Sequence, residues 1–167
     1  MLVFKSPDGL HWTPIAGAPV LTDGAFDSQN LAFWDPTRGE YRAYWRYFSG
    51  NNEGSGGLNP AGVRAIRTAV SKDLVHWGPS ENLRYVDPPA EQLYTNTVAP
   101  YERAPHILIG LPARYADRGW SESLRELPGL EHRLWRAKQS ERLGTAVTDS
   151  LFMASCDADL YAFCFQP

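Results

Sequence analysis

The sequence predicts an all-β fold made of four-stranded antiparallel blades, the unit that propellers repeat, with one helical insertion. The first observation is a repeated phrase: S-P-D-G-L-H-W at Ser6–Trp12 returns as S-K-D-L-V-H-W at Ser71–Trp77, 65 residues later. The second is a series of short segments between and after these copies that are rich in residues favouring strands. The third is a composition of 43% hydrophobic and 21% charged residues, which is typical of a folded globular protein.

One complete blade is expected over residues 23–90, after residues 1–22, which we interpret as the end of a preceding blade. The turn phrase D-P-T-R-G separates its first two strands, because Pro and Gly are placed for a tight reversal. The Gly- and Asn-rich segment Ser49–Pro60 is expected to be a loop. The four strands are expected, in chain order, at Phe26–Trp34, Glu40–Phe48, Val63–Val70 and Asn82–Val86.

An incomplete second blade is expected over residues 91–167, with an insertion at residues 116–143. The insertion contains L-E-H-R-L-W-R-A-K-Q-S-E-R-L-G, which predicts a surface helix with Gly144 just past its C-terminus. The blade is expected to stop after its third strand, where an altered copy of the phrase has Tyr161 in place of Trp. The expected strands are Leu93–Glu102, Pro105–Tyr115 and Gly144–Ser155.

The repeated phrase itself is predicted to be structural. Its Asp follows a strand and can accept hydrogen bonds from the backbone N–H groups of the turn, while its Ser hydroxyl adds another. Its Trp offers a flat surface for a neighbouring blade. We therefore expect the phrase to fasten each blade end and to carry no chemistry.

Composition and motifs exclude several classes of function. A net charge of −3 and a pI near 5.8 argue against a nucleic-acid partner. No apolar run is long enough to span a membrane, so no membrane partner is expected. Met1–Gly9 lacks the apolar core of a signal peptide, and the location of the parent protein stays open. No metal-ligand spacing or phosphate-binding loop is present, so neither metal nor cofactor is expected; Cys156 and Cys164 are interpreted as free or buried thiols.

Five segments together resemble the five-bladed β-propeller glycoside hydrolases, the superfamily that includes families 32, 43, 68 and 117. They are F-D-S-Q-N-L-A-F-W-D-P, Y-W-R, R-A-I-R-T-A-V-S-K-D-L-V-H-W, L-Y-T-N-T-V-A-P-Y-E-R-A-P-H-I-L-I and T-D-S-L-F-M-A-S. The likeness is greatest to bacterial proteins of the family 43-like and family 32-like kind. Five blades need roughly 325 residues, so the resemblance implies a partial propeller, with open blade edges that favour self-association.

The resemblance implies carboxylate-based hydrolysis of glycosidic bonds, which needs two acids beside the scissile bond. Asp27 stands where such enzymes carry the catalytic base or nucleophile, although capping of its own turn is an alternative. Asp149 lies in an otherwise apolar strand and is either functional or part of a buried ion pair. Glu102 would be the general acid, or a surface residue compensated by Arg103.

Six further residues are candidates for binding the hydroxyl or carboxylate groups of a carbohydrate substrate. Structural ion pairs explain the charged members equally well. The candidates are Asn30, Arg46, Arg67, Asn96, Arg103 and His106.

The predicted function of the parent protein is hydrolysis of an oligo- or polysaccharide, with the isolated chain expected to be inactive. A non-catalytic carbohydrate-binding or interaction propeller is the main alternative. Glycoside phosphorolysis is a third, which would need a basic phosphate pocket such as one containing Arg103 or Arg114. Convergence of Asp27, Glu102 and Asp149 within about 10 Å would favour the hydrolase.

Overall fold

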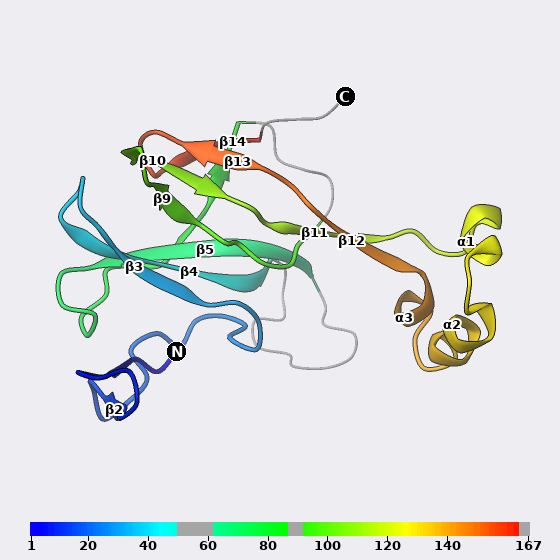
Figure 1. Cartoon of the computed structure of the whole chain (residues 1–167), viewed down its shortest axis with the longest axis horizontal. Coiled ribbons are helices and arrows are strands. Elements are labelled where there is room, and N and C mark those ends of the chain that lie inside the picture. The colour runs from blue at the N-terminus through cyan, green and yellow to red at the C-terminus, as the bar shows by residue number, and fades with distance from the viewer. Residues whose placement is uncertain (50–61, 87–91, 164–167) are drawn as a thin grey trace.

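The computed structural model describes residues 1–49, 62–86 and 92–163, and the predicted loop Ser49–Pro60 and Cys164 fall wholly or almost wholly outside them. The elements form two stacked sheets, an extended hairpin and a helical end (Figure 1). The strands are β1 (Phe4–Lys5), β2 (Thr13–Pro14), β3 (Leu31–Asp35), β4 (Glu40–Ser49), β5 (Val63–Ser71), β6 (Glu81–Asn82), β7 (Arg84–Tyr85), β8 (Gln92–Leu93), β9 (Ala99–Tyr101), β10 (Ala104–Gly110), β11 (Ala113–Asp117), β12 (Ala146–Ser150), β13 (Met153–Ser155) and β14 (Leu160–Phe163).

The first sheet is an antiparallel meander in the order β3-β4-β5-β6. Its long central strands pair from Tyr41 with Ser71 to Ser49 with Val63. Side chains alternate between the two faces of a strand, so Tyr44 and Arg46 face one side while Trp45 faces the other. This alternation places two arginine side chains, described below, on the same face as the apolar core.

The second sheet has the order β7-β14-β13-β10-β9, and its last four strands form a second antiparallel meander. The expectation that this meander stops after its third strand is wrong, because Leu160–Phe163 pairs with β13 as a fourth strand. The sequence signal was weak there because the segment is short and follows an altered copy of the repeated phrase.

The predicted outer strand Asn82–Val86 is divided between the two sheets. Its start joins β6, which pairs with β5, and its next residues form β7, which pairs in parallel with β14. Between them, the Leu83 N–H donates to the Ile66 carbonyl oxygen at 3.0 Å. One short segment therefore links both sheets.

Beyond the second sheet, β11 and β12 form a hairpin with β8 on its edge, and this hairpin leads to three helices at one end of the molecule (Figure 1). The helical insertion is confirmed as α1 (Glu122–Glu126), α2 (Leu130–Ala137) and α3 (Arg142–Thr145). The prediction that Gly144 follows a single long helix is wrong, since Gly144 lies inside α3. A Cβ there would lie 2.5 Å from the Arg133 carbonyl oxygen, so glycine permits the close packing of α3 on α2.

The main core lies between the two sheets. At its centre Tyr44 and Tyr161, both fully buried, share a hydroxyl–hydroxyl hydrogen bond of 2.8 Å. A second, smaller cluster on the other face of the first sheet contains Leu21, Ala43, Trp45 and Ala69. The main cluster contains Tyr44, Ile66, Leu83, Leu93, Val98, Leu108, Leu151, Met153, Ala158, Tyr161 and Phe163.

The repeated phrase folds as predicted in its hydrogen bonding. In each copy the Asp Oδ1 accepts bonds from the backbone N–H groups two and three residues later, and the Ser Oγ accepts one from the N–H three residues after it. The residue after each Asp is left-handed: φ is 75° at Gly9, 66° at Leu74 and 65° at Ala158. The altered third copy therefore keeps the same turn. The Ser–Asp pairs are Ser6–Asp8, Ser71–Asp73 and Ser155–Asp157.

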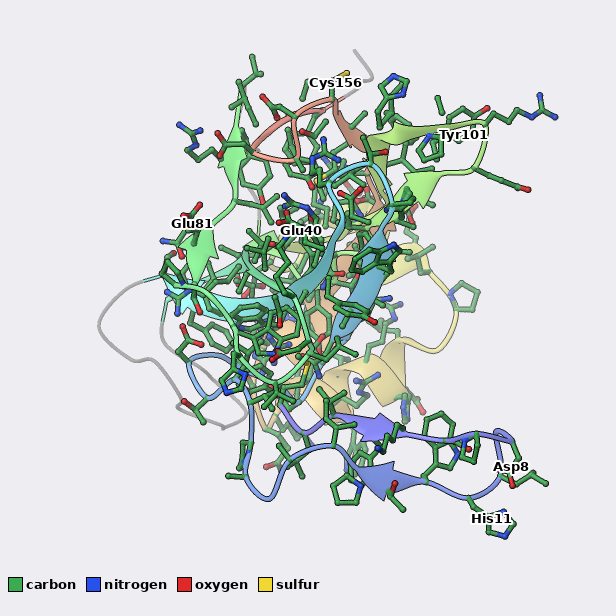
Figure 2. All side chains as sticks on the ribbon, turned by 90° about the vertical axis from the view of Figure 1, so that its left-hand side faces the viewer. Asp8, His11, Glu40, Glu81, Tyr101 and Cys156 are labelled. Carbon is green, nitrogen blue, oxygen red and sulfur yellow. The ribbon has the colours of Figure 1, made fainter. Side chains whose placement is uncertain are left out.

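The expected packing of the phrase's Trp holds for one copy. Trp77 packs against the smaller cluster, whereas Trp12 is 59% exposed. Asp8 and His11, from the same copy of the phrase, lie at the tip of the β1–β2 hairpin, which projects away from the two sheets (Figure 2). All three copies of the phrase thus form the same local turn, and at Trp77 the phrase also contributes tertiary packing.

The all-β class is confirmed, since 42% of the structure is strand and 12% is helix. The described residues form open sheets that are antiparallel except at the β7–β14 pair, with no closed barrel or propeller among them. The two four-stranded meanders are antiparallel, as expected for blades, and both the blade assignment and the five-bladed propeller stay proposals. None of the helices in the described residues is long and apolar enough to cross a membrane.

Candidate functional site: a carboxylate beside two buried arginines

Asp27 presents an exposed carboxylate that is fixed by a buried arginine. It lies in a turn that precedes β3, whereas the sequence predicted that it opens the strand itself. Its side chain is 73% exposed and that of Arg46, on β4, is 4% exposed; an Arg46 Nη2–H donates to Asp27 Oδ1. This hydrogen bond, opposed in part by burial, lowers the pKa of Asp27 below its ordinary value.

The turn around Asp27 is held from both sides. The Ala25 N–H donates to the Arg46 carbonyl oxygen at 2.8 Å, which ties the turn to β4. Asn30 Nδ2 donates to the carbonyl oxygens of Phe26 and Ser28 at 2.9 and 3.0 Å. Asn30, a predicted substrate-binding residue, therefore shapes the turn that presents Asp27.

A second buried arginine, which the sequence interpretation did not select, lies beside the first. Arg64 on β5 is 6% exposed, and its Nη1–H donates to Gln92 Oε1 at 2.5 Å. Its guanidinium carbon lies 4.6 Å from the centre of the Tyr115 ring and 5.4 Å from that of Tyr94. The Arg46 guanidinium carbon lies 5.0 Å from the same Tyr94 ring. The available signal was alternation, because Arg64 shares its strand face with the buried Ile66.

Asp149 forms a cross-strand ion pair. Arg114 lies opposite it in the β11–β12 register, and its Nε and Nη2 donate to the two carboxylate oxygens at 2.8 and 2.5 Å. The side chain of Asp149 is 46% exposed, and the bond from Arg114 lowers the pKa of Asp149. Tyr115 pairs with Thr148, one position away, so Asp149 lies on the opposite face of this hairpin from the ring that contacts Arg64.

Glu102 and Arg103 are exposed in the tight turn between β9 and β10. Figure 2 shows their neighbour Tyr101 at the outer end of this hairpin. Glu102 precedes Arg114, the partner of Asp149, by 12 residues along β10 and β11, which at about 3.3 Å per strand residue is on the order of 40 Å of extended chain. The three predicted acids do not converge. His106 is exposed on β10, and its carbonyl oxygen accepts a bond from Arg38 at 3.4 Å.

Two remaining candidates have structural partners. Asn96 is fully buried, and its Nδ2 donates to the carbonyl oxygens of Gln29 and Tyr44 at 3.3 and 3.4 Å. Arg67 donates to Asn82 Oδ1 and to the Asp23 carbonyl oxygen, each at 3.0 Å. Both side chains therefore connect segments of the fold and lie outside the cluster at Asp27.

A recess of about 770 Å³ lies at β8, β11 and the segment that follows β11. Two of its lining residues, Gln92 and Tyr115, contact Arg64 directly. The other lining residues are Ala116, Asp117, Arg118, Ser121 and Ser123. Within residues 1–49, 62–86 and 92–163, no group of three or more His, Cys, Asp or Glu side chains is placed to hold a metal ion.

Comparison with known proteins adds one structural likeness. No protein-family model matches this chain, and no curated protein matches its sequence. Among solved structures, the chain is similar to an N-acetylgalactosamine deacetylase from F. plautii in complex with blood group B trisaccharide, with a TM-score of 0.53 and 12% identity. The match covers 91% of this chain and 32% of that one. At such low identity the likeness is one of fold. That neighbour is a carbohydrate-active enzyme, and no glycoside hydrolase family is shown.

Proposed function

We propose that this chain is the carbohydrate-contacting part of a carbohydrate-active protein and that Asp27 contacts the sugar. The observation that carries this proposal is an exposed carboxylate held by a buried guanidinium beside a partly exposed aromatic ring, that of Tyr94. Carboxylate oxygens accept hydrogen bonds from sugar hydroxyls, and aromatic rings pack against the apolar faces of sugars. The Ser28 hydroxyl, which donates to the Tyr94 carbonyl oxygen at 3.2 Å, keeps the two parts together.

The ionisation state of Asp27 limits its role. Because the pKa of Asp27 is lowered, the group is an anion at neutral pH and accepts hydrogen bonds. An anionic carboxylate suits a catalytic base or nucleophile, whereas a general acid needs a raised pKa. If the parent protein hydrolyses glycosidic bonds, Asp27 would therefore be its base or nucleophile.

The general acid of such a reaction would come from outside the described cluster, since Asp149 and Glu102 lie elsewhere. The chain spans 32% of the length of the solved structure that it matches, so hydrolysis by the whole protein is part of the proposal. The complex of that neighbour with a trisaccharide supports a carbohydrate ligand for the shared fold. A binding role without catalysis is the alternative, and the separation of the three acids favours it. Arg103 and Arg114 lie far apart, so nothing favours phosphorolysis.

The test is glycan-array binding by the full chain and two matched variants. Asp27→Asn removes the proposed contact, and Asp149→Asn removes another exposed Asp that is paired with an arginine. We expect Asp27→Asn to weaken binding about tenfold or more, and Asp149→Asn to leave it unchanged. Equal binding by the wild type and Asp27→Asn would contradict the proposal. Reducing-sugar release from the bound glycans then separates hydrolysis, which Asp27→Asn should abolish, from binding alone.

A further inference from the structure

Arg64 is a buried cation whose hydrogen-bonding capacity is only partly used. Gln92 Oε1 accepts bonds from the Arg64 Nη1–H at 2.5 Å and from the Arg64 backbone N–H at 3.3 Å. Its Nε is buried without a hydrogen-bond partner. Aromatic rings cover the guanidinium, and no carboxylate of the described residues forms an ion pair with it. A neutral amide oxygen therefore occupies the position at which a buried arginine normally holds an anion.

The surroundings add positive charge. Burial is the main cause that lowers the pKa of Arg64, and the positive charges of Arg142 and Arg46 lower it further, yet an arginine stays charged at neutral pH. Asp27 supplies negative charge to this cluster, but it is bonded to Arg46 and is largely exposed. Two buried positive charges thus face one solvated carboxylate. Burying a cation without a partner costs free energy, and this cost is recovered when an anion binds.

The recess described above gives an anion a route to Arg64. Gln92 and Tyr115 line it and separate it from the guanidinium. Rotation of the Gln92 amide would open Nη1 to an oxygen atom from the recess, and Nη2 at the same end of the guanidinium offers the second donor of a forked pair. Arg118 and Ser121 on the wall supply further donors, and Arg118 offsets the negative charge of Asp117, which lies on the same wall.

We propose that Arg64 is an anion-recognition residue, and that the recess takes an oxyanion substituent, carboxylate or sulfate, of an acidic carbohydrate. The carbohydrate nature of this ligand rests on the proposed function, whereas its oxyanion substituent is inferred from the buried arginines. Arg64 binds the substituent after the Gln92 amide has rotated away from it. Arg46 holds Asp27 in position to contact the neutral part of the sugar.

Thermal unfolding of the full chain tests whether an oxyanion binds to it. The probes are sodium glucuronate, sodium sulfate, glucose as the neutral counterpart of glucuronate, and sodium chloride at matched ionic strength. We expect a saturable rise in Tm with glucuronate, with sulfate or with both, and none with glucose or chloride. A response to glucuronate alone assigns a carboxylate, and one to sulfate alone assigns a sulfate. Equal Tm in all four solutions overturns the proposal.

Two variants of Arg64 and one control locate the site. Arg64→Met replaces the unpaired cation by an apolar chain, so its Tm without anion should equal or exceed that of the wild type, and its anion response should vanish. Arg64→Lys keeps the charge without the fork and should weaken the anion affinity tenfold or more. Arg114→Met removes an arginine outside the cluster and should keep the wild-type response. An unchanged saturable response in Arg64→Met or Arg64→Lys overturns the assignment.

The two proposals fail separately. If neutral glycans on the array bind in a manner that depends on Asp27, while neither glucuronate nor sulfate raises the Tm, the anion site is wrong and the carbohydrate proposal stands. If Tm responds to sulfate through Arg64 and the array is blank, the anion site stands and its carbohydrate carrier is wrong.

Discussion

Two charged clusters at opposite ends of the first sheet differ in their balance. Asp35 is fully buried, and Arg38 and Arg42 lie 2.8 and 3.2 Å from its Oδ2, while its Oδ1 accepts the backbone N–H of Thr37 at 3.0 Å. Every part of that carboxylate has a partner. At the other end, Arg64 has an amide partner and an idle Nε. The Nε of Arg42 also lacks a hydrogen-bond partner, so the two clusters differ in their carboxylates: Asp35 is buried and has partners on both oxygens, whereas Asp27 is exposed. We propose that an added anion supplies the negative charge that the second cluster lacks.

Among substitutions in these two clusters, Asp35→Ala should lower the free energy of unfolding the most. It removes the acceptor of the turn between β3 and β4 and leaves two largely buried arginines short of a partner, although Arg42 keeps Glu40 at 2.8 Å. We expect the free energy of unfolding to fall by about 3–5 kcal/mol. Urea unfolding followed by tryptophan fluorescence measures it. A loss below about 1 kcal/mol would mean that this cluster is as dispensable as a surface ion pair.

Gln92→Glu, in the second cluster, should instead raise the free energy of unfolding. The change puts a negative charge at the atom that already accepts two bonds from Arg64. Since charge-assisted hydrogen bonds are stronger than neutral ones, we expect a gain of about 1–2 kcal/mol in the free energy of unfolding and a weaker response to added anions.

The control for this variant is Gln29→Glu. Gln29 Oε1 accepts the backbone N–H groups of Asn96 and Thr97 and the Thr97 hydroxyl, so none of its hydrogen bonds in the described residues comes from an arginine. It should bring no gain. If both variants stabilise the chain equally, the second cluster has no unmet charge and the contrast between the two ends disappears.

Much of the fold followed from local signals in the sequence. The repeated phrase has a local hydrogen-bond pattern, so its turns were predicted correctly, and the aromatic alternation of β4 gave a central strand. The expectation that the phrase marks the ends of blades was wrong, because its second and third copies lie between the third and fourth strands of the two meanders. The split of Asn82–Val86 between two sheets depends on Tyr161, which is far away in sequence, and no local pattern encodes it. The position of Gly144 inside α3 likewise depends on contact with Arg133.

The candidate site was harder to predict, because the chemical role of a charged residue depends on its tertiary partners. Asp27 and Arg46 were selected separately, and only the fold joins them. Asp35 entered the sequence interpretation only as the first residue of the turn phrase D-P-T-R-G, yet it is fully buried and pairs with Arg38 and Arg42. Arg64 was missed because an arginine in an alternating strand usually faces solvent, and its burial follows from β8 and β11 lying across it.

Asp27→Asn should have the smallest effect on the free energy of unfolding, and this effect should depend on pH. The asparagine oxygen still accepts the Arg46 bond, and the side chain is 73% exposed, so the loss at neutral pH should be about 1 kcal/mol or less. The pKa of Asp27 is lowered in the folded chain. Its contribution is therefore present above the unfolded value of about 3.9 and is lost as pH falls through the lower folded value.

The difference in unfolding free energy between wild type and Asp27→Asn should thus be constant from about pH 7 to pH 5 and shrink toward pH 3 and below. Other acids titrate in both proteins, so their effects cancel in this difference. Urea unfolding at several pH values measures it. A difference that grows as pH falls would require a raised pKa, and Asp27 would then suit a general acid instead of the anionic sugar contact proposed for it.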